Sequence, residues 1–166
     1  MANEVYLREG TQLLVNNGTG KNYTWTVEAL ANAAGRVSVQ IDLGAAPRPY
    51  RFKWVCECQF QATPTQYKGL EIYRACAPSW DNTRIDGDIG LVDAALADVD
   101  MRQNLKFIGY VVSENAAASE KCNASGIFEH EHRYISFVAY NDSGAAVNAT
   151  ADNFKFWFEP IWYQGQ

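Results

Sequence analysis

The stretch that decides the fold is Pro-Tyr-Arg-Phe-Lys-Trp-Val-Cys-Glu-Cys-Gln-Phe, residues 49–60. Its aromatic residues and cysteines share one parity, at Tyr50, Phe52, Trp54, Cys56, Cys58 and Phe60. The other parity is charged or polar apart from Val55. Successive side chains of a β-strand point to opposite faces, so the stretch predicts a strand with one buried and one solvated face. We expect it to be a central strand of an antiparallel sheet, beginning at Pro49, where a missing N–H is tolerated.

Apolar alternation recurs in short segments along the chain, at residues 23–27, 37–43, 70–76, 104–114, 126–140 and 154–159. Turn clusters separate these segments, and helical periodicity is scarce. The pattern predicts an all-β fold of about eight strands, an antiparallel β-sandwich or jelly roll. About six residues join 37–43 to 49–60, so we expect these two strands to be adjacent antiparallel partners.

Two segments stand outside this alternation. Residues 1–20 end in the turn cluster Asn16–Gly20 and are interpreted as an N-terminal arm, which leaves residues 21–166 as a single β-sandwich domain. Residues 77–103 are rich in Asp, Asn, Gly and Ala and are interpreted as one long loop. A loop of that length inside a compact domain is often functional.

Composition limits the classes of partner. The 166 residues carry a formal net charge of −5 with a pI of about 5.0, which argues against nucleic acid, because phosphate binding favours a basic surface. No apolar run approaches the roughly 20 residues that span a bilayer, so no membrane partner is expected. The first ten residues lack the features of a signal peptide, which predicts synthesis in a cytoplasm without export by that route.

Histidines and clustered carboxylates offer possible metal ligands in two places. His130 and His132 are spaced to face the same way on a strand, as in cupin metal sites, but they are the only two histidines. The favoured interpretation is a polar, outward sheet face. In the long loop, clustered carboxylates and glycines are compatible with calcium, although a solvated loop is favoured because the spacing does not match an EF-hand: Asp81, Asp86, Asp88 and Asp93.

Neither the cysteines nor the sequence motifs indicate catalysis. Cys56 and Cys58 would have Cα atoms roughly 6.5–7 Å apart on one strand face, so buried free thiols are favoured over a disulfide. A zinc site that also uses Cys76 and Cys122 remains the alternative, although the spacing matches no common zinc module. Nucleophile-elbow, dinucleotide-binding and P-loop motifs are absent, so neither enzymatic activity nor a cofactor is expected.

Several segments carry a resemblance to a known family. They lie at residues 1–11, 50–54, 69–73, 86–90, 93–95, 102–109, 124–126, 133–135 and 148–154. Through them the chain resembles a family of tailed-bacteriophage virion structural proteins. The resemblance implies a head decoration (cement) protein that binds the outer capsid surface and stabilises it.

That resemblance implies the major capsid protein and further copies of this chain, as a homotrimer, as partners. It also implies location on the virion after synthesis in the host cytoplasm. We expect the arm and the long loop to make the contacts, together with free tryptophans; the candidate residues are Val5, Tyr6, Leu7, Arg8, Trp80, Arg84, Trp157 and Trp162. The alternatives are a minor tail protein, a carbohydrate-binding β-sandwich in host attachment and a metal-dependent cupin-like enzyme.

Overall fold

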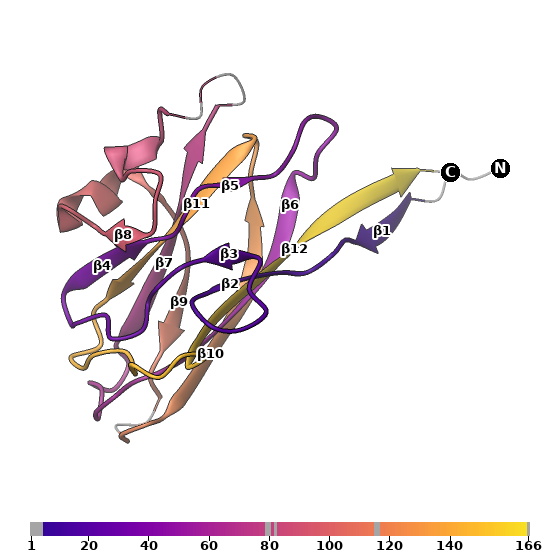
Figure 1. The fold of residues 1–166 in the computed structure, drawn as a ribbon. Helices are drawn as coiled ribbons and strands as arrows, with labels where there is room; N and C mark the ends of the chain where they lie inside the picture. The colour runs from indigo at the N-terminus through magenta and orange to yellow at the C-terminus, as the bar shows by residue number, and fades with distance from the viewer. Residues whose placement is uncertain (1–4, 79–80, 82, 115–116, 166) are drawn as a thin grey trace.

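The computed structural model describes residues 5–78, 81, 83–114 and 117–165, which form two β-sheets packed face to face (Figure 1). The predicted central strand is β6 (Arg51–Gln59), and its buried and accessible residues alternate as its sequence indicates. It lies between two long antiparallel neighbours in one of the sheets. The predicted fold class, an antiparallel β-sandwich of the jelly-roll type, is therefore confirmed.

Sheet A contains β6 and, in the order β10-β6-β12-β2-β3, the strands β10 (Lys121–Glu129), β12 (Phe154–Gly165), β2 (Leu13–Asn16) and β3 (Tyr23–Thr24). An additional strand, β1 (Val5–Glu9), also pairs with β12. The neighbours are antiparallel except for β2 and β3, which are parallel. Sheet A is thus the layer that carries the chain's N-terminal strand, and its last strand as well.

Sheet B has the order β8-β4-β11-β7-β9 and consists of β8 (Ala94–Ala95), β4 (Ala34–Val37), β11 (Tyr134–Asn141), β7 (Gly69–Ala77) and β9 (Lys106–Val112). A short strand, β5 (Ile41–Asp42), pairs with the start of β11. Three of the twelve described strands, β3, β5 and β8, have only two residues each, too few for alternation to reveal them.

The segment 37–43 does not pair with β6 as predicted. Its two ends, β4 and β5, both pair with β11 in sheet B, whereas β6 lies in sheet A. The connection at residues 43–50 therefore crosses from one layer to the other. Its length suits either a hairpin or such a crossing, so length alone gave the wrong partner.

The main core lies between the two sheets and is mostly aromatic. Phe137 of β11 meets Phe156 of β12 with ring centroids 4.6 Å apart, and Trp25 contacts both of these rings. Trp25 also donates a hydrogen bond from Nε1 to the Arg36 carbonyl at 3.1 Å, which satisfies its polar atom inside the core.

The predicted long loop covers the outer face of sheet B (Figure 1). It contains β8 and two 3₁₀ helices, η1 (Asp86–Asp88) and η2 (Val99–Asn104). Apolar side chains of the loop, together with Leu105 just after it, form a second, smaller core against the sheet, made of Ile89, Leu96 and Leu105 with Val37, Ala75 and Val138. Both faces of sheet B are therefore covered, which explains why its central strand β11 is apolar on both parities.

Trp54 fills the side of the sandwich where edge strands β9 and β10 approach each other. A Cβ atom at Gly126, directly opposite Trp54 on β10, would lie 2.8 Å from the indole Nε1. A Cβ atom at Gly109 on β9 would collide with the six-membered ring. The two glycines thus leave the space that the indole occupies.

We predict that Gly109→Ala will lower the free energy of unfolding by about 1–3 kcal/mol, because the added methyl overpacks the Trp54 ring. Urea denaturation followed by tryptophan fluorescence measures this. Ser125→Ala, on the solvated face of β10, is the control and should change stability by less than about 0.5 kcal/mol. If the two variants are equally stable, the Trp54 ring does not exclude a methyl group at position 109.

Candidate functional site

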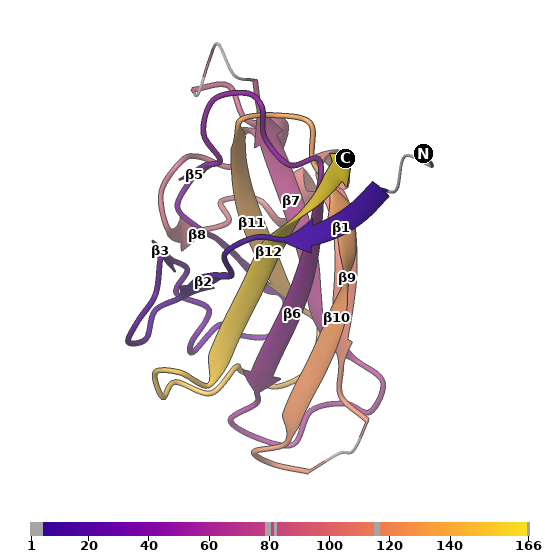
Figure 2. The same cartoon turned by 90° about the vertical axis from the view of Figure 1, so that its right-hand side faces the viewer.

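The candidate site is a two-stranded arm that projects from sheet A (Figures 1 and 2). Strand β1 pairs with the end of β12, from Glu9 opposite Ile161 to Val5 opposite Gly165. On the other side of β12, β6 reaches only as far as Arg51 opposite Ile161. Beyond that point β12 is paired with β1 alone, so the two strands leave the sandwich as a ribbon.

The base of the arm depends on a close approach between Gly10 and Pro160. The Gly10 N–H donates to the Pro160 carbonyl at 2.9 Å, and a Cβ atom at Gly10 would collide with the proline ring. The missing N–H of Pro160 faces the same side as its carbonyl, where the chain passes from β1 to β2 and the ladder is interrupted. Proline is therefore tolerated inside this long strand.

Charged residues also join the arm to the sandwich. The Lys53 ammonium of β6 pairs with Glu9 of β1 and lies 3.8 Å from Glu159 of β12. These pairs are exposed, so they add little stability to the junction. Beside them is a hollow of about 660 Å³ lined by Arg8, Glu9, Gly10, Thr11, Leu13, Pro160 and Trp162.

The arm's chemistry is that of a free sheet edge. Within the described residues, the outer edge of β1 has no neighbouring strand, and the end of β12 lacks one on the side that β6 occupies lower down. Such edges present unpaired N–H and C=O groups that accept an added strand. A ribbon of two strands is only marginally stable alone in water, so this element gains most from an external partner.

The structure brings together some of the predicted contact residues. Val5, Tyr6, Leu7 and Arg8 all lie in β1, and Arg8 is opposite Trp162 in the arm. The C-terminal half of the arm was missed, because the alternation was followed only to Glu159 in front of Pro160. Its signal was the continuing apolar stretch at residues 161–163.

The remaining predicted contact residues lie elsewhere. Trp157 is half-buried on the outer face of sheet A, opposite Val55 and on the parity opposite to Trp162. The two tryptophans therefore do not form one flat platform. Arg84 is exposed in the segment that covers sheet B, where its guanidinium pairs with Asp81 at 3.0 Å. Trp80 falls outside the described residues.

The two histidines do not lie on an outward sheet face as predicted. Both lie in the short connection between β10 and β11, and His130 is buried. Its Nδ1 accepts a hydrogen bond from Arg74 Nη1 at 3.1 Å and lies 3.6 Å from Cys76 Sγ. Burial, followed by the Arg74 charge, lowers the pKa of His130 to about 3, so the ring is neutral.

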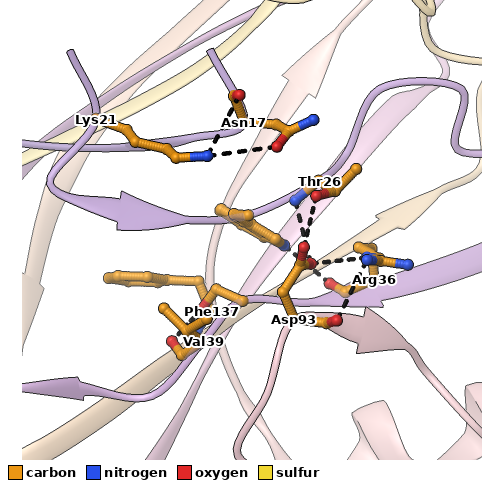
Figure 3. Close-up of polar contacts among 9 residues, drawn as sticks. Asn17, Lys21, Thr26, Arg36, Val39, Asp93 and Phe137 are labelled. Atoms are coloured by element: carbon orange, nitrogen blue, oxygen red, sulfur yellow. Dashed lines mark hydrogen bonds and ion pairs between the residues drawn. The ribbon is translucent and has the colours of Figure 1, made fainter. Parts of the chain in front are cut away.

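The four loop carboxylates do not gather into one site, although Asp86 and Asp88 both lie in η1. Asp93 accepts hydrogen bonds from Thr26 and Arg36, the latter at 2.8 Å (Figure 3). Burial opposes its ionisation, but these hydrogen bonds outweigh it and hold the pKa of Asp93 below its usual value. Asp86 accepts from the Cys76 N–H and Asp81 from Thr83. The described residues contain no group of three or more His, Cys, Asp or Glu side chains arranged for a metal.

Comparison with known proteins identifies no family for this chain. No known family model matches the chain, and no curated protein matches it. Among solved structures, murine APRIL, in a crystal structure at pH 8.0, is similar with a TM-score of 0.41 and 10% identity; the match covers 76% of this chain and 98% of that one. In the described part of the chain, no helix has the length and apolarity needed to cross a membrane.

We predict that His130 makes the fold sensitive to acid. Its folded pKa of about 3 lies below the ordinary value of 6.5, so from pH 6.5 downward the unfolded chain binds a proton that the folded chain does not. The contribution of His130 to the free energy of unfolding is complete above pH 6.5 and falls as the pH is lowered. Between pH 7.5 and pH 5 it falls by about 2 kcal/mol. Urea denaturation at the two pH values measures the loss.

The variant His130→Gln keeps an acceptor for Arg74 but does not titrate, so its stability should change less between these pH values. His132→Gln is the matched control and should keep the wild-type difference. If His130→Gln loses as much stability as the wild type on acidification, the buried imidazole is not the cause.

Proposed function

We propose that this chain is a structural component of a tailed-phage particle, a head decoration (cement) protein that attaches through its two-stranded arm. The observation that carries the proposal is the projection of β1 and the end of β12 beyond the sandwich, where both outer edges lack a neighbouring strand among the described residues. The resemblance of the sequence to phage virion proteins supplies the particle as the place where such an arm would find a partner.

The form of the sandwich supports an adhesive role. The space between the sheets is filled by large aromatic side chains, and a second core fills the outer face of sheet B. Recognition is then left to edges and outer surfaces, where main-chain hydrogen bonds supply affinity. A ribbon of about five residue pairs makes few such bonds, so we propose that several copies, as a trimer on the major capsid protein, combine weak contacts by avidity.

We predict that removing residues 2–9 will leave a folded sandwich that no longer occupies particles. The β6–β12 ladder does not depend on β1, so the core should persist, whereas the added-strand contacts are lost. Occupancy on purified particles is measured by sedimentation and gel densitometry, with survival after heating as a second readout. We expect apparent affinity to fall by about tenfold or more, because each lost contact is repeated in every copy.

A point variant tests whether binding requires the position of β1 and not only its presence. Gly10→Val should push β1 away from Pro160 and reproduce the loss in part. The control Lys121→Ala lies at the opposite end of sheet A and should bind as the wild type does. Full occupancy by the truncated protein would contradict attachment through the arm, and density on the tail in particle images would favour the minor tail role.

A further inference from the structure

Three polar side chains meet near the turn that follows β2, and some of their oxygens have no hydrogen-bond partner among the residues that the structure describes. Asn16 is the last residue of β2, Glu28 lies in the connection after β3, and Asp152 lies in the turn before β12. The Asp152 carboxylate packs against Gly18 so closely that a Cβ atom there would collide with it. The peptide group of Asn17 lies close enough to Glu28 to influence its ionisation.

Asn16 is the fully buried member of this group. Its Nδ2 donates to Asp152 Oδ1 at 3.2 Å, which places the amide against that carboxylate. Its Oδ1, on the same amide, is buried and has no hydrogen-bond partner among the described residues. A buried amide oxygen without a partner is costly, and a bound ion or an ordered water is a common reason for one.

Glu28 also has buried oxygens, and unlike the Asn16 amide its side chain can carry a charge. Both of its carboxylate oxygens are buried and neither has a hydrogen-bond partner in the described part of the chain. Burial raises the pKa of Glu28, the backbone N–H groups of Glu28 and Asn17 beside the carboxylate offset this only in part, and the Asp152 charge adds to the rise. The buried Glu28 carboxylate therefore lies near a second carboxylate, that of the exposed Asp152, and a buried carboxylate is unfavourable unless a cation or a proton offsets its charge.

We propose that Asn16 Oδ1 and the carboxylates of Glu28 and Asp152 bind a divalent cation, calcium in the first instance, whose remaining positions are filled by water. All the ligands are hard oxygens, which suit calcium and magnesium and disfavour zinc or copper. The irregular origin of the ligands, from three separate segments, suits the flexible coordination of calcium better than the strict octahedron of magnesium.

The nearby cationic side chains, Lys21 and Arg36, bind other groups and not the carboxylates of the proposed site. Lys21 donates from Nζ to the carbonyl and side-chain oxygens of Asn17, both at 3.4 Å, at the rim of the turn (Figure 3). Arg36 is bound to Asp93. Asp152 has no ion pair in the described residues. The position also differs from the loop carboxylates that the sequence suggested for calcium.

The cation would have a structural effect. Val15, next to Asn16, is opposite Phe156 in the β2–β12 ladder, and β2 pairs with β3 through Asn16 itself. A cation would therefore tie together the end of β2, the connection after β3 and the start of β12. This proposal does not depend on the phage assignment.

The experiment compares the full chain, freed of metal with a chelator, with and without added calcium chloride. Isothermal titration should show one site with a dissociation constant of about 10⁻⁴–10⁻³ M, the range of open structural sites. At about tenfold excess over that constant, calcium should raise the melting temperature by about 3 °C. Glu28→Gln and Asp152→Asn should each weaken binding by about tenfold or more, because each removes a charged ligand.

Asp100→Asn is the matched control, since it removes one exposed carboxylate elsewhere, and it should leave both readouts unchanged. The simplest rival is that Glu28 is protonated and needs no ion. In that case Glu28→Gln melts at or above the wild-type temperature, and calcium changes neither protein. That result, or equal calcium binding by wild type and Glu28→Gln, would overturn the proposal.

Discussion

The antiparallel ladder between β6 and β12 is the interaction on which the rest of the structure depends. It places Phe154, Phe156 and Phe158 in the interior beside the aromatic parity of β6, and it fixes the register of the strand that continues into the arm. Because side chains alternate strictly along a strand, a slip of one residue would turn all of these rings to solvent. The core therefore specifies the arm's direction as well as its own packing.

The sequence predicted the elements with strong alternation and failed where another constraint decided. The two parities of β6 identified the fold class, because a half-buried strand must show them. The pairing of 37–43 was wrong, since linker length does not say whether a chain turns back or crosses to the other sheet. For the candidate site, an N-terminal arm was predicted and its partner strand was not, because the alternation was followed only to Glu159. The strand continues through Pro160, whose missing N–H faces an interrupted ladder.

His130 illustrates a second limit of reasoning from sequence. A polar residue with a polar neighbour two positions away predicts a solvated face, and the prediction was wrong because Arg74 and Cys76 on β7 provide a polar setting inside the sandwich. Nothing local to residues 130–132 indicates a partner some fifty residues away in the chain. Buried polar contacts of this kind are set by tertiary structure, as is the meeting of Asn16, Glu28 and Asp152.

The arm and the oxygen cluster after β2 are subject to the same physical requirement, that polar groups need partners. Backbone groups on a free strand edge and buried carboxylate oxygens are both polar groups that the described protein leaves without partners, and each raises the free energy until something supplies them. Water can serve the exposed edges of β1 and β12, so the arm remains available to a neighbouring chain. Water can hydrogen-bond a buried carboxylate but does not neutralise its charge, which is why a cation is the partner we infer for Glu28.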